Sequence, residues 1–272
     1  MTSTPLAAPP AVTPGVARTP GRRRPRVGLL RRWVSPLLIL IVWQLLCMAG
    51  ILDERTMASP TQIFGRAVEL VQDGTLGSAI LVSLKRVGLG LAIGATIGLA
   101  LALVAGLSRI GDAAIDPPMQ MLRTLPFLGL IPLFIIWMGI GETPKIALIA
   151  MGVAFPLYLN TLAGIRGIDR KTTEAARAMH LTWSQRIRHV VLPGAMPQVL
   201  TGLRQSLGIA WLALIVAETV SASSGLGYLI NHARDFLQID VIVVGLAVYS
   251  VLGLVTDTLV RYLESRALAW RA

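Results

Sequence analysis

Charged side chains are scarce in this sequence. Asp, Glu, Lys and Arg make up 14% of its 272 residues, whereas a soluble domain typically carries about 25%. Cysteine is rarer still, and because Cys47 is the only one, an intrachain disulfide is excluded. The histidines have neither the spacing of metal ligands nor a cysteine pair beside them, so we expect no metal site. They are His180, His189 and His232.

Hydrophobic residues, by contrast, make up 54% of the chain and gather in long runs. A helix needs about 20 mostly apolar residues to cross the hydrocarbon layer of a bilayer, and several runs reach that length. The sequence therefore predicts an all-α membrane protein with about six transmembrane helices. We place them at 33–52, 79–107, 119–140, 145–165, 197–221 and 241–262.

The net charge of +11 has two interpretations. A basic soluble protein would suggest nucleic acid as a partner, but here the basic residues flank apolar spans. With the N-terminus inside, most of the Lys and Arg residues fall in cytoplasmic segments, as the orientation rule requires. We therefore predict no nucleic-acid partner, a disordered basic cytoplasmic tail at 1–32, a transmembrane domain at 33–265 and a cytoplasmic end at 266–272. A cleaved secretory signal, the alternative for the N-terminus, would have a shorter apolar stretch.

Small residues recur every four positions along the second predicted span. Positions four apart lie on one face of a helix, so these residues form a ridge. In lipid, a ridge of small side chains lets two helix backbones approach closely. We expect this face to pack against another helix, and its members are Gly90, Gly94, Gly98, Ala102 and Gly106.

The third and fifth predicted spans hold three residues that could lie beside a path through the bundle. Pro126 and Pro132 each remove a backbone hydrogen bond and bend the third span, which suits a helix beside a pathway. A purely structural kink is the alternative. Glu218, near the outer end of the fifth span, is expected to pair with Arg234 or to cap an outer gate.

The loop after the first span begins with the sequence Ser59-Pro60-Thr61-Gln62. A serine N-cap, a proline at the first helical position and a glutamine at the third are typical of a helix start. We predict a short amphipathic helix on the outer face, against the bilayer or against the bundle.

The polar segment 166–194 is too long for a simple turn between two spans, so it needs structure of its own. Thr173 is predicted to cap a first short helix with Glu174 in its first turn, where the helix dipole favours an acid. Thr182 and Gln185 form a capping box for a second helix. A helix–turn–helix can also bind DNA, but its place between two spans favours docking of a cytoplasmic protein.

This segment resembles the EAA loop of the permease subunits of binding-protein-dependent ABC importers. The resemblance rests on Glu174-Ala175-Ala176 followed by Val190 and Leu192-Pro193, and similar segments run from about 33 to 268. Stretches such as LPFLGLIPLFIIWMGIGETPKI and FPLYLNTLAGIRGID are similar to the nitrate, sulfonate and taurine branch of the family. One position differs, because His180 stands where the family has glycine. Histidine tolerates a positive φ better than most residues, so we expect the turn to survive.

The resemblance implies a type I importer permease in the bacterial cell membrane, with both termini in the cytoplasm. It implies no cofactor in this chain, because ATP is bound by a partner ATPase dimer. A second permease copy, as a homodimer, and an external solute-binding protein would complete the transporter. The solute would be a small anion or zwitterion, aliphatic sulfonates foremost, with nitrate or taurine as alternatives. The ATPase would dock on the coupling loop, 166–194, through Glu174, Ala175, Ala176, His180, Leu192 and Pro193.

Two other classes of protein remain as alternatives. An ion-coupled carrier typically places ionisable residues at mid-membrane, whereas Arg204, Glu218 and Asp257 lie toward the predicted span ends. A membrane-embedded enzyme would need a nucleophile with a base, or metal ligands, inside the bundle, and no histidine lies in a span core. ATP binding by this chain is not predicted, because Pro144 interrupts the nearest approach to a phosphate loop.

Overall fold

The computed structural model describes residues 29–53 and 57–269, and every regular element within these ranges is a helix. The described residues fall into two units, which divide between Val42 and Trp43. The first unit contains most of α1 (Leu29–Met48). Residues 1–28 and 270–272, which hold most of the predicted tail and the last residues of the C-terminal end, lie outside the described residues.

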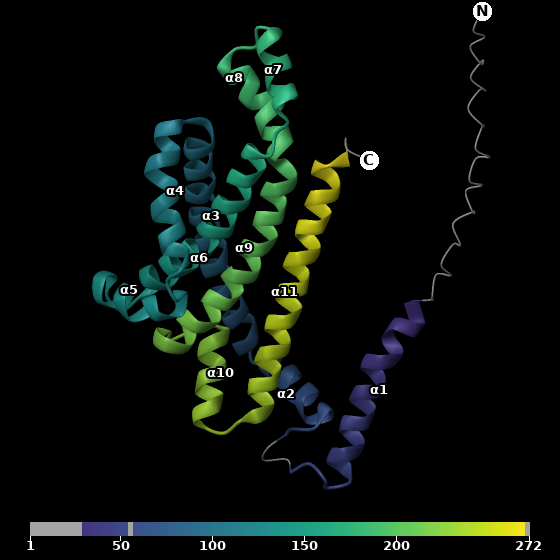
Figure 1. Cartoon of the computed structure of the whole chain (residues 1–272). Helices are drawn as coiled ribbons and strands as arrows, with labels where there is room; N and C mark the ends of the chain where they lie inside the picture. The colour runs from purple at the N-terminus through teal and green to yellow at the C-terminus, as the bar shows by residue number, and fades with distance from the viewer. Residues whose placement is uncertain (1–28, 54–56, 270–272) are drawn as a thin grey trace, which may run out of the picture. The chain divides into compact units, whose positions relative to one another are not determined.

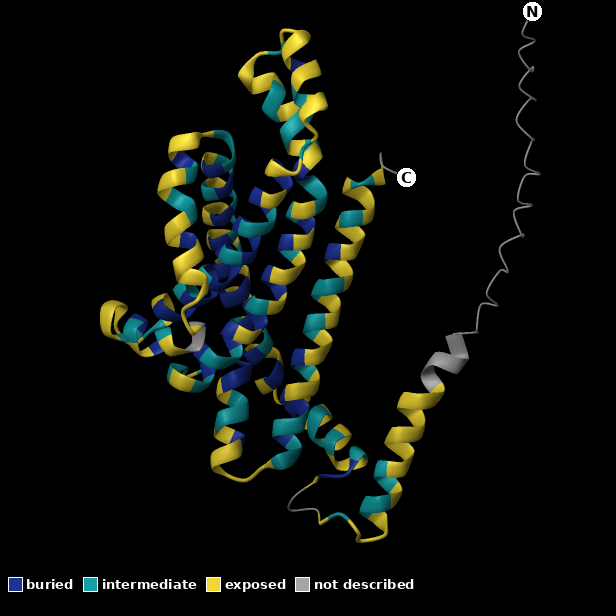
Figure 2. Cartoon of the chain, viewed as in Figure 1, coloured by how far each residue is buried: buried dark blue, intermediate teal, exposed yellow. Residues whose placement is uncertain are grey.

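Four helices of the second unit are long and apolar enough to cross a membrane. They match the second, fourth, fifth and sixth predicted spans and are α3 (Thr75–Leu107), α6 (Glu142–Arg166), α9 (Leu192–Ser221) and α11 (Ile239–Ala267). Helix α6 is the central one, since 61% of its most apolar window is buried, against 28% for α3 and 22% for α11. Figure 2 shows this burial concentrated along α6 and the facing sides of its neighbours.

The small-residue ridge on α3 faces α6. Gly90, Gly94 and Gly98 are all buried. A Cβ built on Gly94 or Gly98 would lie under 3.0 Å from the carbonyl oxygen of Ala150 or Ala154, so the two backbones are nearly in contact. Only a residue without a side chain fits there, because displacing backbone would separate the helices.

The predicted single span at 119–140 is wrong. The chain instead forms α4 (Arg109–Arg123), a short 3-10 helix η1 (Phe127–Leu130) and α5 (Ile131–Met138). Ser108 starts α4 by accepting a hydrogen bond from the Gly111 amide at 3.2 Å. Helix α4 ends before Pro126, because a proline disfavours helical geometry in the residue before it. Pro132 lies in the first turn of α5, where its missing N–H is harmless.

Two short helices lie at the end of the bundle away from α7 and α8 (Figure 1). Helix α2 (Pro60–Gln72) begins with the predicted capping box, in which Ser59 and Gln62 each bond to the other's backbone, so that prediction is confirmed. Helix α10 (Leu226–Asp235) packs between α9 and α11.

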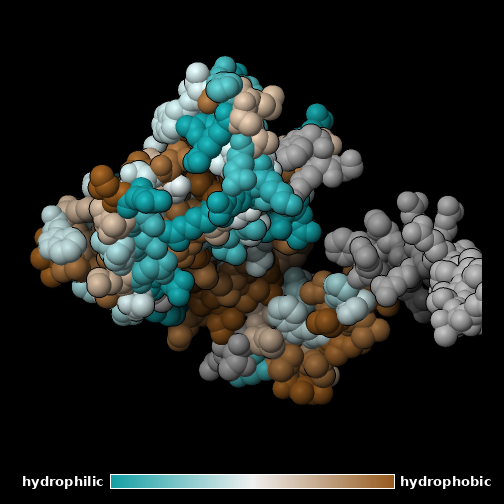
Figure 3. Space-filling view, turned by 45° about the horizontal axis from the view of Figure 1, so that its top comes forward, coloured by the Kyte–Doolittle hydropathy of each residue, from teal (hydrophilic) through white to brown (hydrophobic). Residues whose placement is uncertain are grey.

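The opposite end of the bundle carries α7 (Arg170–Ala178), α8 (Trp183–Arg186) and the π-helix η2 (Ile187–Val191). Helix α8, η2 and α9 form one continuous helical run of 39 residues, Trp183–Ser221. At 1.5 Å per residue this run is about 58 Å long. Figure 3 shows hydrophilic side chains gathered over this end of the molecule and an apolar surface beyond it.

Candidate functional site

The first helix of the coupling loop begins four residues earlier than predicted. Asp169 is its N-cap, and the Asp169 carboxylate accepts a hydrogen bond from the Lys171 amide at 3.0 Å. Thr173 therefore lies inside α7, and its prediction as the cap is wrong. Glu174 falls in the second turn, beyond the positive end of the helix dipole, so the dipole argument for it is wrong as well. Its carboxylate instead pairs with Arg170 at 2.8 Å on the exposed surface.

The turn after α7 is built around His180, which has a φ of 53°. The His180 amide donates to the Arg177 carbonyl at 2.9 Å, and the Leu181 amide donates to the Ala176 carbonyl at 3.2 Å. These two bonds form a Schellman motif, in which the residue at the position of His180 is left-handed and is usually glycine. The prediction that histidine preserves the turn is confirmed.

The second helix starts with the predicted capping box of Thr182 and Gln185, which is also confirmed. Ala176 is buried beneath the pair of helices, whereas Ala175 is exposed. Two large apolar side chains point outward at the tip of the loop, because Met179 is 73% exposed and Trp183 is 62% exposed. Apolar side chains of this size on an otherwise polar loop are typical of a surface that another protein covers.

Leu192 and Pro193 form the first turn of α9 and follow the π-helix directly. The helical run continues through Pro193 into the membrane span. Pro193 lacks an N–H, so one backbone hydrogen bond is missing within this run. Helix α8 and η2 of the coupling loop are continuous with α9.

A buried ion cluster, which the sequence analysis missed, lies where α3, α6, α9, α10 and α11 meet. Arg86 and Glu218 are 2% and 1% exposed, and their side chains are 2.6 Å apart. Arg86 also holds both oxygens of Glu142, at 2.6 and 2.7 Å. Lys145 lies 3.2 Å from Glu142, so the two positive and two negative charges cancel. Arg234 pairs instead with Asp235, and its predicted pairing with Glu218 is wrong.

The carboxylate of Glu218 accepts hydrogen bonds from elements far apart in the chain. Its partners besides Arg86 are the Ser83 hydroxyl at 2.8 Å, the Tyr249 hydroxyl at 3.1 Å and the Gly227 amide at 2.7 Å. A buried charge is tolerated only when its hydrogen-bonding capacity is filled. Here that requirement joins α3, α9, α10 and α11 at one point.

Gly225 completes the cluster at the start of α10. Its φ is 106°, and a Cβ there would collide with both Glu218 and Arg86. The Arg86 guanidinium reaches the Ser224 carbonyl at 2.7 Å because no side chain intervenes at the next position. The cluster thus depends on glycine at position 225, which adopts a positive φ and leaves space for the side chains of Arg86 and Glu218.

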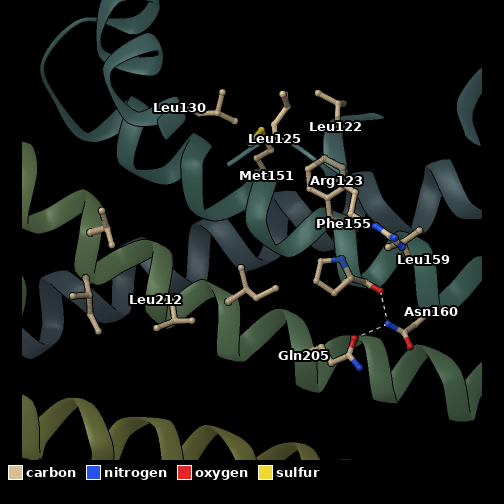
Figure 4. A pocket seen from close by; sticks show the side chains of 14 residues that line it. Leu122, Arg123, Leu125, Leu130, Met151, Phe155, Leu159, Asn160, Gln205 and Leu212 are labelled. Carbon is tan, nitrogen blue, oxygen red and sulfur yellow. Dashed lines mark hydrogen bonds between the residues drawn. The ribbon is translucent and has the colours of Figure 1, made fainter. Parts of the chain in front are cut away.

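A cavity of about 560 Å³ opens between the break after α4, α6 and α9 (Figure 4). Its walls are mainly aliphatic and aromatic, and three side chains bring polar groups to it: Arg123, Asn160 and Gln205. The Asn160 amide donates to the Pro156 carbonyl at 2.8 Å and to the Gln205 side-chain oxygen at 2.9 Å. Irregular backbone at membrane depth is tolerated where it lines such a cavity.

The three sequence candidates for the pathway are not among the described residues that line this cavity. Pro126 caps η1 and Pro132 begins α5, so they shape the break whose neighbours Leu125 and Leu130 do line it. Glu218 belongs to the buried ion cluster. The structure places Arg123 at the cavity because α4 ends at this residue. The prediction of one unbroken span at 119–140 did not identify Arg123 as a site residue.

The fold and this geometry define a class: a multi-pass helical membrane protein with a capped helical loop whose second helix continues into a span beside a cavity. Residues 94–268 match the family model described as "Binding-protein-dependent transport system inner membrane component". The chain belongs to this family and is a permease of the ABC importer type.

Relatives match over nearly the full length. The chain is 45% identical over 238 residues to the permease SsuC of Escherichia coli (strain K12), covering 88% of this chain and 90% of that protein. It is 42% identical over 256 residues to SsuC of Bacillus subtilis (strain 168), covering 94% and 92%. Both are named for aliphatic sulfonates transport. Among solved structures, an amino acid ABC transporter has a TM-score of 0.61 at 21% identity, covering 73% of this chain and 97% of that chain, which supports the fold.

Proposed function

We propose that this chain forms the membrane pathway of an ATP-driven importer of aliphatic sulfonates. A cytoplasmic ATPase dimer docks on the coupling loop, a second copy of the chain completes the pathway, and a solute-binding protein delivers the substrate from outside. The names of the two SsuC relatives support the substrate, and nitrate or taurine remain the alternatives within the branch.

One observation carries the coupling role: Trp183, one of the two exposed apolar side chains at the tip, begins the continuous helical run that becomes a membrane span. The run is about 58 Å long, so a displacement of α8 at its outer end would be passed along the helix to the membrane span. Movement of a docked ATPase would therefore shift α9, which forms one wall of the cavity. Access to the cavity could then alternate without any chemistry in this chain.

Glu174 allows a charge test of docking. Glu174→Lys breaks the surface pair with Arg170, which is worth only about 0.3–0.5 kcal/mol, and reverses the charge presented to the partner. We expect it to reduce co-purification of the ATPase while membrane insertion stays normal. The double variant Arg170→Glu/Glu174→Arg restores an ion pair within α7 but keeps the reversed charge at position 174.

The two variants separate docking from helix stability. If Glu174 contacts the ATPase, the double variant also loses co-purification. Recovery of co-purification in the double variant would mean that Glu174 only stabilises α7, and the docking role of this residue would be rejected. Trp183→Ala supplies an uncharged check, since it removes exposed apolar area without touching the ion pair.

A further inference from the structure

The cavity beside α9 has the size of a ligand site, and its lining is apolar except for three polar side chains. Its volume of about 560 Å³ lies within the range of roughly 300–1,000 Å³ that small-molecule sites occupy. Such sites have mainly apolar walls and few polar groups. Here the polar groups are Arg123, from the end of α4, and the side-chain amides of Asn160 and Gln205, from α6 and α9.

Arg123 is the one ionisable side chain among the described residues that line the cavity. It forms no ion pair with any described residue, and no described carboxylate lines the cavity with it. Figure 4 shows its side chain beside Phe155 and Leu159, against the apolar wall. An unpaired guanidinium beside an apolar wall is a suitable binding site for an anion.

Arg123 is an exposed residue at the end of α4 that lies away from the coupling loop. Helix α4 starts beside the end of α6, since Asp112 pairs with Arg166, and its 15 residues extend about 20 Å from there. The guanidinium is therefore remote from the polar surface at the coupling loop. Its exposure at the cavity leaves it accessible to a solute during passage.

Gln205 has a free donor for the same ligand. Its side-chain oxygen accepts from Asn160, whose amide also bonds to the Pro156 carbonyl, so Asn160 fixes how Gln205 is turned. The nitrogen of the Gln205 amide has no bonding partner among the described residues. A fixed amide donor and a guanidinium are two groups that oxyanions accept bonds from.

We propose that this cavity is a transit site for alkyl oxyanions, with Arg123 and Gln205 holding the sulfonate and the apolar wall holding the alkyl chain. The inference rests on the proposed function and narrows its substrate. Taurine carries an ammonium group, and no described carboxylate of the cavity can meet it. Nitrate would leave the apolar wall unused. Alkanesulfonates match both parts of the site.

The test measures binding of labelled ethanesulfonate to the assembled transporter in proteoliposomes without the solute-binding protein, in competition with a series of unbranched alkanesulfonates. Each methylene that enters the apolar wall should tighten apparent affinity about fourfold until the cavity is full, since burying a CH₂ group is worth roughly 0.8 kcal/mol. An affinity that does not change with chain length would overturn the assignment of the wall.

Variants test the polar part of the site. Arg123→Gln should reduce alkanesulfonate import at least tenfold in transporters that still assemble with the ATPase, and Arg123→Lys should retain part of the import. Arg109→Gln, at the other end of α4, is the matched control and should import like the parent. Gln205→Leu gives a second readout and should raise the KM for the sulfonate more than it lowers kcat.

Normal import by an assembled Arg123→Gln transporter would overturn this inference and leave the proposed function intact. A parent transporter that imports nitrate or taurine but no alkanesulfonate would overturn both. A third outcome concerns Leu212, an exposed residue of the cavity wall. If Leu212→Ala prevents assembly instead of changing the chain-length preference, a second copy of the chain fills the cavity and the inference fails.

Discussion

Replacing Glu218 with glutamine should destabilise the protein strongly although the side-chain volume hardly changes. Two oxygens of the carboxylate accept bonds from Arg86, Ser83, Tyr249 and the Gly227 amide. An amide has only one oxygen, so its NH₂ group must face at least one of these donors. It also leaves Arg86 with less compensating charge in a buried position.

The expected magnitude follows from these contacts. Breaking a buried pair by removing one partner costs about 3–5 kcal/mol. Glu142 still holds Arg86 through two bonds, so we expect the lower end, about 3 kcal/mol. For a chain of this size, 1 kcal/mol shifts the melting temperature by about 2–4 °C. Thermal unfolding in detergent, followed by circular dichroism, should therefore show a decrease of about 6–12 °C.

Two controls make the result specific to the buried pair. Glu142→Gln should have a smaller effect, because the Glu142 side chain is 55% exposed and water can replace what it loses. Replacing both Arg86 and Glu218 with Met should recover much of the loss, since no uncompensated charge remains. A Glu218→Gln protein that melts within 2 °C of the parent would refute the argument that this cluster holds the helices together.

Three further outcomes are expected. Gly94→Leu should reduce assembly, because overfilling a packed contact costs roughly 1–3 kcal/mol, whereas Gly88→Leu on the open side of α3 should assemble normally in the same co-purification assay. His180→Gly should relieve a left-handed conformation that costs a non-glycine residue roughly 1–2 kcal/mol, and hydrogen exchange of the coupling loop should slow; faster exchange would contradict the turn geometry. Arg204 of α9 pairs with Glu264 near the end of α11, which supports a C-terminus on the coupling-loop side, so a reporter fused there should be active only in the cytoplasm.

Local chemistry was predictable from the sequence wherever a few neighbouring residues decide the structure. The capping boxes at Ser59 and Thr182 and the left-handed turn at His180 all depend on contacts within a few positions. Thr173 was predicted as the first cap, but α7 is capped by Asp169. Both residues can cap, and the sequence around them does not show which one α7 starts from.

Long-range structure was predictable only in part. Run length identified the four full-length helices, but the break after Arg123 was hidden because the residues beyond it are as apolar as a span. Arg86 and Glu218 lie 132 positions apart, so no local pattern joins them. Two charged residues within apolar runs could have indicated the pair, since each needs a partner of opposite charge in lipid.

The central claim, that this chain is the permease of an ATP-driven importer, is tested most directly by uptake into proteoliposomes containing the chain and its partner ATPase. The solute-binding protein and a labelled alkanesulfonate are supplied on one side, and ATP on the side of the coupling loop. We expect the label to accumulate only when ATP, ATPase and binding protein are all present. Accumulation driven by an ion gradient without the ATPase would contradict the account and identify an ion-coupled carrier instead.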